Sequence, residues 1–486
     1  MENLVQQATQ NVNLQAIMPS LVLCSFALVL LMFCAFTQRG KTTLISWLSI
    51  GALVITALVT LFGWNDPQAG FAGSVLQDNF ATFFSMIFIV AAGLTILMSD
   101  DYLQREGFPI AEYYPLILFA TAGAMWMASG TDLLTIFLGL EVLSVALYVL
   151  AGFFRSQTRS NEAGLKYFFL GAFSTGFLLY GVALLYGVTG TTKIAGIGAY
   201  VTQHPDTAMN TMFIAGGLLL LIGFLFKVAA APFHMWTPDV YQGAPTPITA
   251  FMSAGPKAAA FAALMRVAVV SLDGLQMELS SLFWVLAVLT MIVGNFIALS
   301  QQDLKRMLAY SSIAHAGYAL VGLTAWNEVG LSAILFYMLV YTFMNLGAFA
   351  VLVLIGKKGE SNLTLAGVAG LGYKRPILGI ALCIFLFSLM GLPPTAGFTG
   401  KFYIFAGALK AGYVWLAIIG VLNSAVSLYY YLRVIVQMYF KEAEEDFAWV
   451  SINMPTAVSI AISLVGVLYL GVVPGSLMQL AKLAGF

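Results

Sequence analysis

The sequence predicts an all-α polytopic membrane protein of about 14 transmembrane helices. Of its 486 residues, 60% are apolar and 9% are charged, and the mean hydropathy is +0.92. Soluble domains are roughly 45–50% apolar and about 25% charged. Apolar runs of about 20 residues, each long enough to cross about 30 Å of hydrocarbon, recur along the whole chain. Because every backbone amide in lipid needs an internal partner, these runs are expected to form a helical bundle.

The predicted helices follow one another with short connections. Each apolar run is bounded by charged, glycine-containing or proline-containing segments that end a span. The first run follows a polar rather than a basic segment, and we expect it to be a retained helix and not a signal peptide. The spans are centred in the windows 14–36, 42–64, 79–98, 113–129, 132–153, 164–188, 210–231, 246–270, 281–300, 306–325, 329–355, 376–409, 413–440 and 455–473.

Basic residues in the connections predict the orientation of the helices, because cytoplasmic loops carry an excess of lysine and arginine. The termini and the connections after even-numbered helices hold only Lys193, Lys410 and Lys482. We therefore expect the connections after odd-numbered helices to lie in the cytoplasm and both termini to lie on the outer side. The basic residues of the odd-numbered connections are Arg39, Lys41, Arg105, Arg155, Arg159, Lys305, Arg306, Lys357, Lys358, Lys374, Arg375 and Lys441.

Six basic residues fall inside predicted helices. Arg266 and Arg433 lie nearer the helix ends, where a long side chain can reach the membrane interface, and we expect them to do so. A lysine in the middle of the bilayer costs at least about 2.5–3.5 kcal/mol on insertion, so the other four are expected to face protein or water and to have a function. These four are Lys166, Lys227, Lys257 and Lys401.

Glu141 is the one acidic residue deep in a predicted span. It follows Asp132 by about nine residues, roughly 14 Å along a helix, which places it near the midplane. A buried carboxylate and a buried amine each favour the neutral form alone and the charged form together, so such a pair can act as a proton switch. The alternative is a static salt bridge that fixes helix packing. One carboxylate and four lysines would leave three lysines without an acid, which favours a proton relay.

Two predicted helices are interrupted beside a lysine. Pro232 removes a backbone donor and ends the seventh helix just after Lys227, and the freed carbonyls at that end favour a nearby cation. The twelfth helix is interrupted beside Lys401 by Gly391, Pro393, Pro394 and Gly397. The breaks are five helices apart, and a unit with an odd number of helices repeats upside down in a membrane. The pattern therefore indicates two inverted five-helix repeats, helices 4–8 and 9–13.

The whole chain, residues 1–486, is accordingly expected to form a single transmembrane domain. Its predicted parts are an N-terminal three-helix segment (1–110), a first inverted repeat (111–272), a second inverted repeat (273–442) and a C-terminal helix (443–486). Nothing in the short connections suggests a separate soluble domain.

Histidines could extend a proton path, because their charge changes near neutral pH. His234 follows the first break, and His315 lies in the tenth predicted span next to Tyr310. Each of the two histidines could equally be a satisfied helix contact, and the sequence leaves both interpretations open. His204, in a polar outer connection, is not expected to take part.

Several kinds of chemistry have no sequence signal. Cys24, Cys34 and Cys383 lie singly in apolar runs, without the spacing of a disulfide framework or an iron–sulfur site. We find no phosphate-binding, dinucleotide, zinc or haem motif. The formal net charge of zero argues against nucleic acid as a partner. We therefore expect proton-handling residues but no redox centre, bound cofactor, metal site or covalent catalytic residue in this chain.

Three segments resemble a known family. They are "FKVAAAPFHMWTPDVYQGAPTPITAF" (226–251), "QQDLKRMLAYSSIAHAGYALVG" (301–322) and "GLPPTAGFTGKFYIF" (391–405). These segments are similar to the antiporter-like membrane subunits of respiratory complex I, the proton-translocating NADH:quinone oxidoreductase, and the similarity spans nearly the whole chain. The form "TPDVYQGAP", Lys401 in place of a glutamate, and an end soon after helix fourteen are typical of the N-type subunit.

The resemblance implies a fold of fourteen helices around a hydrated axis, and a role for each buried charge. Glu141 and Lys227 resemble the coupling pair of the family, Lys257 its central relay residue, and Lys401 the residue facing the proton exit. Lys166 matches a supporting lysine of N-type chains. The implied partners are the M-type subunit, small membrane subunits and membrane lipids. NADH, FMN, iron–sulfur clusters and quinone are expected in other subunits, and the expected location is the bacterial plasma (inner) membrane.

The expected function is proton movement from the cytoplasm outward, coupled to quinone reduction in other subunits. Three alternatives remain at this point. The chain could be a stand-alone or Mrp-type Na⁺/H⁺ antiporter, which would use the same buried charges with a dehydrated Na⁺ site. It could be a structural spacer whose lysines are satisfied by carbonyls and water. It could also serve a related complex that takes electrons from ferredoxin, F420 or a hydrogenase module.

Overall fold

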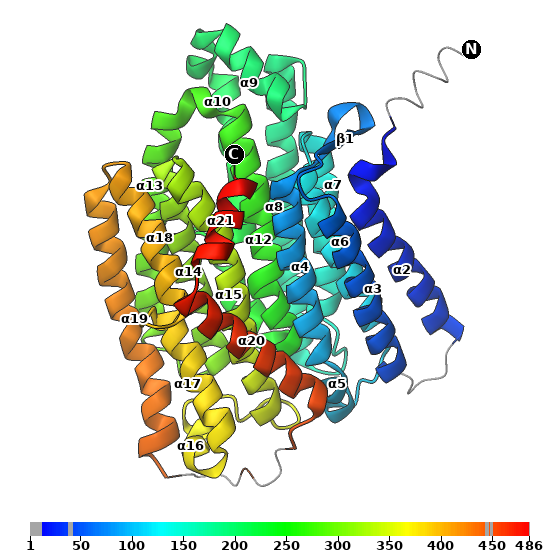
Figure 1. The fold of residues 1–486 in the computed structure, drawn as a ribbon, viewed down its shortest axis with the longest axis vertical. Coiled ribbons are helices and arrows are strands. Elements are labelled where there is room, and N and C mark those ends of the chain that lie inside the picture. The colour runs from blue at the N-terminus through cyan, green and yellow to red at the C-terminus, as the bar shows by residue number, and fades with distance from the viewer. Residues whose placement is uncertain (1–11, 37–41, 443–446, 448–450, 486) are drawn as a thin grey trace.

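The computed structural model describes residues 12–36, 42–442, 447 and 451–485. Arg39 and Lys41 of the first predicted cytoplasmic connection lie outside the described residues. The described chain is a bundle of helices with one small β-hairpin, in which β1 (Gln68–Gly70) pairs antiparallel with β2 (Val75–Gln77), Gln68 opposite Gln77. Figure 1 shows the hairpin and α9 at one end of the bundle, and α5 and α16 at the other.

The helices are α2 (Met18–Phe36), α3 (Thr42–Phe62), α4 (Asn79–Leu97), α5 (Asp100–Glu106), α6 (Tyr113–Ser129), α7 (Leu133–Ala151), α8 (Thr158–Thr189), α9 (Ile194–Gln203), α10 (Thr211–Val228), α11 (Trp236–Gly243), α12 (Thr246–Ser271), α13 (Gln276–Ala298), α14 (Leu304–Ala325), α15 (Glu328–Ile355), α16 (Leu371–Lys374), α17 (Pro376–Met390), α18 (Ala396–Lys410), α19 (Val414–Phe440), α20 (Met454–Val472) and α21 (Gly475–Ala484). Short 3₁₀ turns join several of them.

The prediction of an all-helical, multi-pass membrane chain is confirmed, and the exact number of spans is not. Each predicted window falls on a helix, with 376–409 falling on both α17 and α18. Among the described residues, however, 11 helices are long and apolar enough to cross a membrane, or up to 12 if one bent pair is a single span. The shorter α6 has 17 residues, and α17 and α18 have 15 each. The count of 14 therefore stays a prediction.

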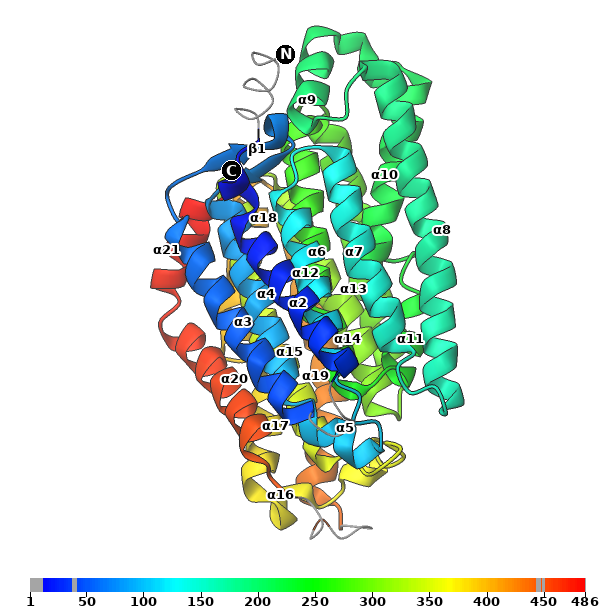
Figure 2. The same cartoon turned by 90° about the vertical axis from the view of Figure 1, so that its right-hand side faces the viewer.

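The centre of the bundle is formed by α12 and α15. Every residue in the apolar window of α12 is buried, and so are 89% of those in α15, whereas the windows of α2, α3 and α19 are only 33–39% buried. The two views agree that α2 and α3 lie at one edge and that α19 lies away from them (Figure 2). A helix that is buried on all sides can hold charged residues away from lipid. Lys257 lies on α12.

The prediction that Arg266 reaches the membrane interface is wrong. Its side chain is buried, and its two terminal nitrogens bind both carboxylate oxygens of Asp78 at 3.0 and 2.8 Å. The Nε–H donates to the carbonyl of Ala128 at 2.9 Å. Asp78 is the N-cap residue of α4, so the start of that helix supplies a carboxylate beside the C-terminal part of α12. Arg433 is half-buried and donates to the carbonyls of Leu299 and Gln301, which follow α13.

Candidate functional site

Glu141 and Lys227 come from neighbouring elements, α7 and α10. The Lys227 ammonium is buried and donates a 2.8 Å hydrogen bond to the hydroxyl of Ser144. Ser144 lies three residues after Glu141, on the same face of α7. No ion pair joins Glu141 to Lys227 within the described chain, and Glu141 Oε1 is buried without a protein partner. Ser144 therefore binds Lys227 beside the carboxylate, and the two charges are close without being in contact.

Aromatic rings enclose the Lys227 ammonium. Its nitrogen lies 5.5 Å from the ring centre of Tyr148 and 5.2 Å from that of Tyr167. Tyr167 in turn stacks on Trp236 of α11, with 4.6 Å between the ring centres. The negative faces of aromatic rings attract a cation, and their bulk excludes lipid. Lys227 can thus stay charged in the interior without a direct carboxylate.

The break after Lys227 lies where the sequence predicts it. Helix α10 ends at Val228, and Ala229 adopts a left-handed conformation with φ of 62°. Pro232 follows, and the chain becomes helical again at Trp236. The expectation that the carbonyls of this helix end hold a cation is not met by Lys227, which turns toward α7 instead. The Trp236 indole takes one of these carbonyls, that of Phe226, at 3.0 Å.

Lys257 lies in the middle of the bundle and contacts α14. Its ammonium donates to the carbonyl of Ser312 at 2.6 Å and also to the Ser312 hydroxyl. The ring of Tyr341 on α15 lies 5.9 Å away. No carboxylate pairs with Lys257 among the described residues. A lysine bound only by neutral oxygens and an aromatic ring can lose its proton without leaving a buried anion behind.

His315 lies between Lys257 and Lys401. Its Nδ1 is 2.6 Å from the hydroxyl of Tyr337, and its Nε2 is 3.4 Å from that of Tyr431. Ser312, His315 and Tyr318 recur every three residues along α14 and so share one face. Ser312 binds Lys257, and the Tyr318 ring lies 4.6 Å from the Lys401 ammonium. This face of α14 therefore connects the two lysines.

Lys401 binds the helix end that precedes the second break. Its ammonium donates to the carbonyls of Leu389 and Met390, each at 3.0 Å, and to the Ser424 hydroxyl at 2.9 Å. These are the last carbonyls of α17, which Gly391 ends with a φ of 85°. Pro393 and Pro394 follow, and α18 begins at Ala396. A cation at a helix C-terminus satisfies carbonyls that have no partner in the helix.

Lys166 differs from the other three lysines. Its ammonium lies 2.6 Å from Glu162 and 2.6 Å from Asp239, and its side chain is 39% exposed. Asp239 also binds Arg306 of α14 at 2.6 Å. The expectation that the lysines other than the partner of Glu141 lack an acid is therefore wrong for Lys166. The structure begins α8 at Thr158, earlier than predicted, which places Lys166 near the end of the helix within reach of these acids.

Two of the three predicted relay residues, Tyr310 and His234, do not belong to the connection between Lys257 and Lys401. Tyr310 interacts with Arg306, one turn before it on α14. His234 is half-buried in the break, and no hydrogen bond between its ring and a predicted site lysine is found in the described structure. Among the three predicted relay residues, only His315 is brought between two buried lysines.

Sequence reasoning missed the acceptors that hold the lysines. Ser144, Ser424 and Tyr337 are ordinary residues in apolar helices, and no motif marks them. Only Ser144 had a usable signal, its position three residues after Glu141. No group of three or more His, Cys, Asp or Glu residues in the described chain could hold a metal ion.

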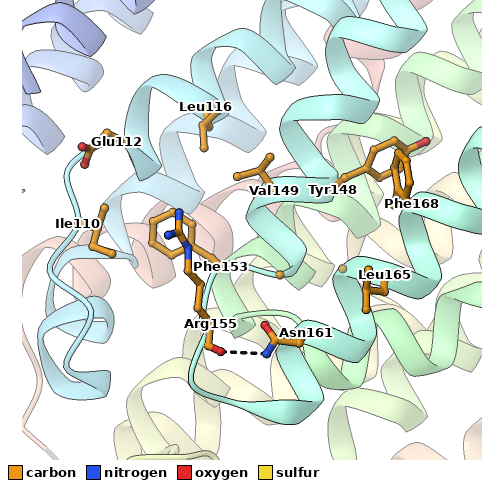
Figure 3. Close-up of a pocket in the computed structure, with 12 residues that line it drawn as sticks. Ile110, Glu112, Leu116, Tyr148, Val149, Phe153, Arg155, Asn161, Leu165 and Phe168 are labelled. Carbon is orange, nitrogen blue, oxygen red and sulfur yellow. Dashed lines mark hydrogen bonds between the residues drawn. The ribbon is translucent and has the colours of Figure 1, made fainter. Parts of the chain in front are cut away.

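A pocket of about 690 Å³ opens between α6, α7 and α8, beside the aromatic rings that enclose Lys227. Figure 3 shows its lining, which is mostly apolar but includes Glu112 and Arg155; the carbonyl of Arg155 accepts a 2.9 Å hydrogen bond from Asn161. Tyr148 lines the pocket and also belongs to the ring cage around Lys227.

Comparisons with known proteins find close relatives over the whole chain. Residues 130–427 match the family described as NADH:quinone oxidoreductase/Mrp antiporter, transmembrane. The chain is 58% identical to NADH-quinone oxidoreductase subunit N of Trichlorobacter lovleyi, over 99% of this chain and 98% of the relative. It is 44% identical to the subunit N of Chloroflexus aggregans, over 97% of each chain. A solved chain of respiratory complex I from Thermus thermophilus is 36% identical, with a TM-score of 0.81, covering 96% of this chain and 100% of that one.

Proposed function

The chain belongs to the NADH:quinone oxidoreductase/Mrp antiporter transmembrane family, and on that premise we propose that it is the N-type, antiporter-like subunit of a proton-translocating NADH:quinone oxidoreductase. It moves protons outward from the cytoplasm through buried lysines, while other subunits carry out the redox reaction. NADH, FMN, iron–sulfur clusters and quinone are assigned to those subunits. The relatives named as subunit N favour this assignment over a stand-alone Na⁺/H⁺ antiporter.

One observation carries the proposal: three buried lysines are held by neutral oxygens and aromatic rings. Lys227 donates to Ser144, Lys257 to Ser312, and Lys401 to Ser424 and two carbonyls. A static salt bridge would bring each ammonium against a carboxylate. A neutral acceptor instead tolerates both forms of the lysine, so small changes in nearby charge can load or release a proton.

Glu141 is the group that supplies this change of charge. When its carboxylate approaches Lys227, the charged ammonium is favoured, and when the carboxylate moves away or is neutralised, Lys227 tends to release its proton. The perturbation passes to Lys257, then along the Ser312, His315 and Tyr318 face of α14 to Lys401. Lys166, paired with Asp239 near one end of the bundle, takes a supporting role.

We further propose the finer features of the architecture. The chain has fourteen spans, with inverted repeats over 111–272 and 273–442 between an N-terminal segment (1–110) and a C-terminal helix (443–486). It lies in the bacterial inner membrane with both termini outside, next to an M-type subunit and small membrane subunits. The two helix breaks, each beside a lysine and each following a left-handed residue, support the repeat.

Glu141→Gln tests the function. The amide keeps the shape of the side chain and removes the charge, so we expect the complex to assemble while NADH-driven quinone reduction and proton pumping in inside-out vesicles both fall by about tenfold or more. Glu328→Gln is the matched control, because Glu328 is an exposed acid at the start of α15. Wild-type turnover and pumping by an assembled Glu141→Gln complex would instead favour a structural spacer.

A further inference from the structure

A row of polar residues runs along α12 toward Lys257. Thr246, Thr249 and Ser253 precede Lys257 at steps of three to four residues, so all four lie on one face of the helix. From Thr246 to Lys257 the row covers roughly 16 Å at 1.5 Å per residue. All four residues are buried, on the helix at the centre of the bundle.

The facing helix α15 supplies matching polar groups. The side-chain amide of Asn345 donates to the Ser253 hydroxyl. Asn345 Oδ1 and the Tyr341 hydroxyl are both buried and have no protein partner in the described structure. Buried polar atoms of this kind usually bind water. Because Tyr341 and Asn345 are one turn apart, water bound by them would lie between Ser253 and Lys257.

The row ends at Glu360, in the connection after α15. One oxygen of this carboxylate pairs with the Lys305 ammonium at 2.7 Å. The other accepts the Tyr102 hydroxyl at 2.6 Å and also the hydroxyl of Thr246, the first residue of the row. Lys305 donates to the Ala244 carbonyl as well, at 2.7 Å. The cluster thus joins α5, the start of α12 and the start of α14.

The connection holds Glu360 in a constrained position. Glu360 has a φ of 57°, an uncommon conformation for a residue other than glycine. The amide of Gly359 is bound by Glu106 at 2.8 Å. Burial raises the pKa of the Glu360 carboxyl, but Lys305, Thr246 and Tyr102 together hold it below its ordinary value. Both oxygens of the carboxylate are bonded, and these contacts favour its charged form as long as the pair with Lys305 is closed.

We propose that Thr246, Ser253 and Asn345 line a proton-entry path to Lys257, and that the Glu360–Lys305 ion pair is the latch at its solvent end. This inference rests on the proposed function. When the pair opens, Glu360 takes a proton from the solvent. It passes that proton to the hydroxyls and water of the row, and Lys257 accepts it on its neutral amine. Glu360 returns to the carboxylate and pairs with Lys305 again.

Ser253→Ala and Glu360→Gln test the path in the assembled complex. Each should slow NADH-driven quinone reduction by about three- to tenfold and increase its solvent deuterium isotope effect, because proton delivery to Lys257 becomes slower. Ser271→Ala is the matched control: Ser271 is a buried serine on the same helix whose hydroxyl bonds only the Val267 carbonyl. It should keep wild-type turnover and isotope effect.

The outcomes separate this inference from the proposed function. If Ser253→Ala and Glu360→Gln both behave as Ser271→Ala does, while Glu141→Gln still lowers quinone reduction and proton pumping, the entry path is wrong and the proton-pump function stands. If Glu141→Gln also pumps normally, the function itself is wrong. Should Glu360→Gln fail to assemble, Ser253→Ala decides alone, since a loss of packing would not raise the isotope effect.

Discussion

At the scale of single residues, the chemistry of this chain depends on what accepts a hydrogen bond from each lysine. Lys227 has one oxygen acceptor, the Ser144 hydroxyl, and otherwise meets aromatic rings. Lys401 has three oxygen acceptors. A buried cation with fewer acceptors is less stabilised in its charged form. Lys227 is therefore the lysine most sensitive to a change in the charge of Glu141.

Removing the hydroxyl of Ser144 should make the charged form of Lys227 less stable. Hydrogen bonds to charged groups contribute about 1.5–3 kcal/mol, so Ser144→Ala is expected to lower coupled turnover by about tenfold while the complex still assembles. The measurement is NADH-driven proton pumping in inside-out vesicles. Ser49→Ala is the control, because the buried Ser49 hydroxyl bonds only a carbonyl of its own helix. Equal pumping by the two variants would show that Ser144 does not hold Lys227 in the working state.

At the scale of elements, the two broken helices place their lysines differently. After α10, Lys227 turns away to α7, and the Trp236 indole binds the Phe226 carbonyl. After α17, Lys401 reaches back across the break and binds the last carbonyls of the helix. The same local device, a proline-containing break beside a lysine, therefore yields a lysine facing a carboxylate in one case and a lysine capping a helix in the other.

Gly391→Ala should disturb the second break specifically. Gly391 has a φ of 85°, and a Cβ added there would lie 3.0 Å from Lys401 Cδ and 3.4 Å from its ammonium nitrogen. Gly412 has the same φ of 85° but open space around its Cβ. Both alanine variants are strained by about 1 kcal/mol through the backbone. Because only the Cβ at position 391 would press on Lys401, only Gly391→Ala should also reduce proton pumping. Equal loss in both would assign the effect to backbone strain rather than to Lys401.

At the scale of the whole molecule, the two ends of the bundle differ in the basic residues that they carry. Arg105, Lys305, Lys358 and Lys374 belong to the elements and connections of the end that holds α5 and α16, whereas α9 and the hairpin lie at the opposite end (Figure 1). The predicted orientation places the end with α5 and α16 in the cytoplasm. The Glu360 latch is at that same end, as a path for protons entering from the cytoplasm requires.

Cysteine labelling tests the orientation. In a chain whose three native cysteines are replaced by alanine, Lys358→Cys should react with a membrane-impermeant maleimide in inside-out vesicles only. Gln203→Cys, on α9, should react in right-side-out vesicles only. Both positions are exposed in the structure. Labelling after detergent treatment is the control for reactivity, and the opposite pattern would reverse the assigned sides.

The membrane class, the helix positions and the two breaks were determined by the sequence itself. The reason is physical: apolar length fixes where a chain can cross lipid, and proline and glycine act on their own backbone. The same local chemistry indicated Glu141, Lys227, Lys257 and Lys401 as unusual, because a charge within an apolar run is costly wherever the helix lies.

Only the tertiary structure decided which groups those charges meet. Arg266 pairs with Asp78, 188 residues away, and Lys166 pairs with Asp239, 73 residues away. The serine acceptors likewise come from other helices, and Glu360 comes from the connection after α15. Such contacts depend on how helices pack around α12 and α15, and packing is set by the summed shapes of many side chains. No short stretch of sequence contains that information.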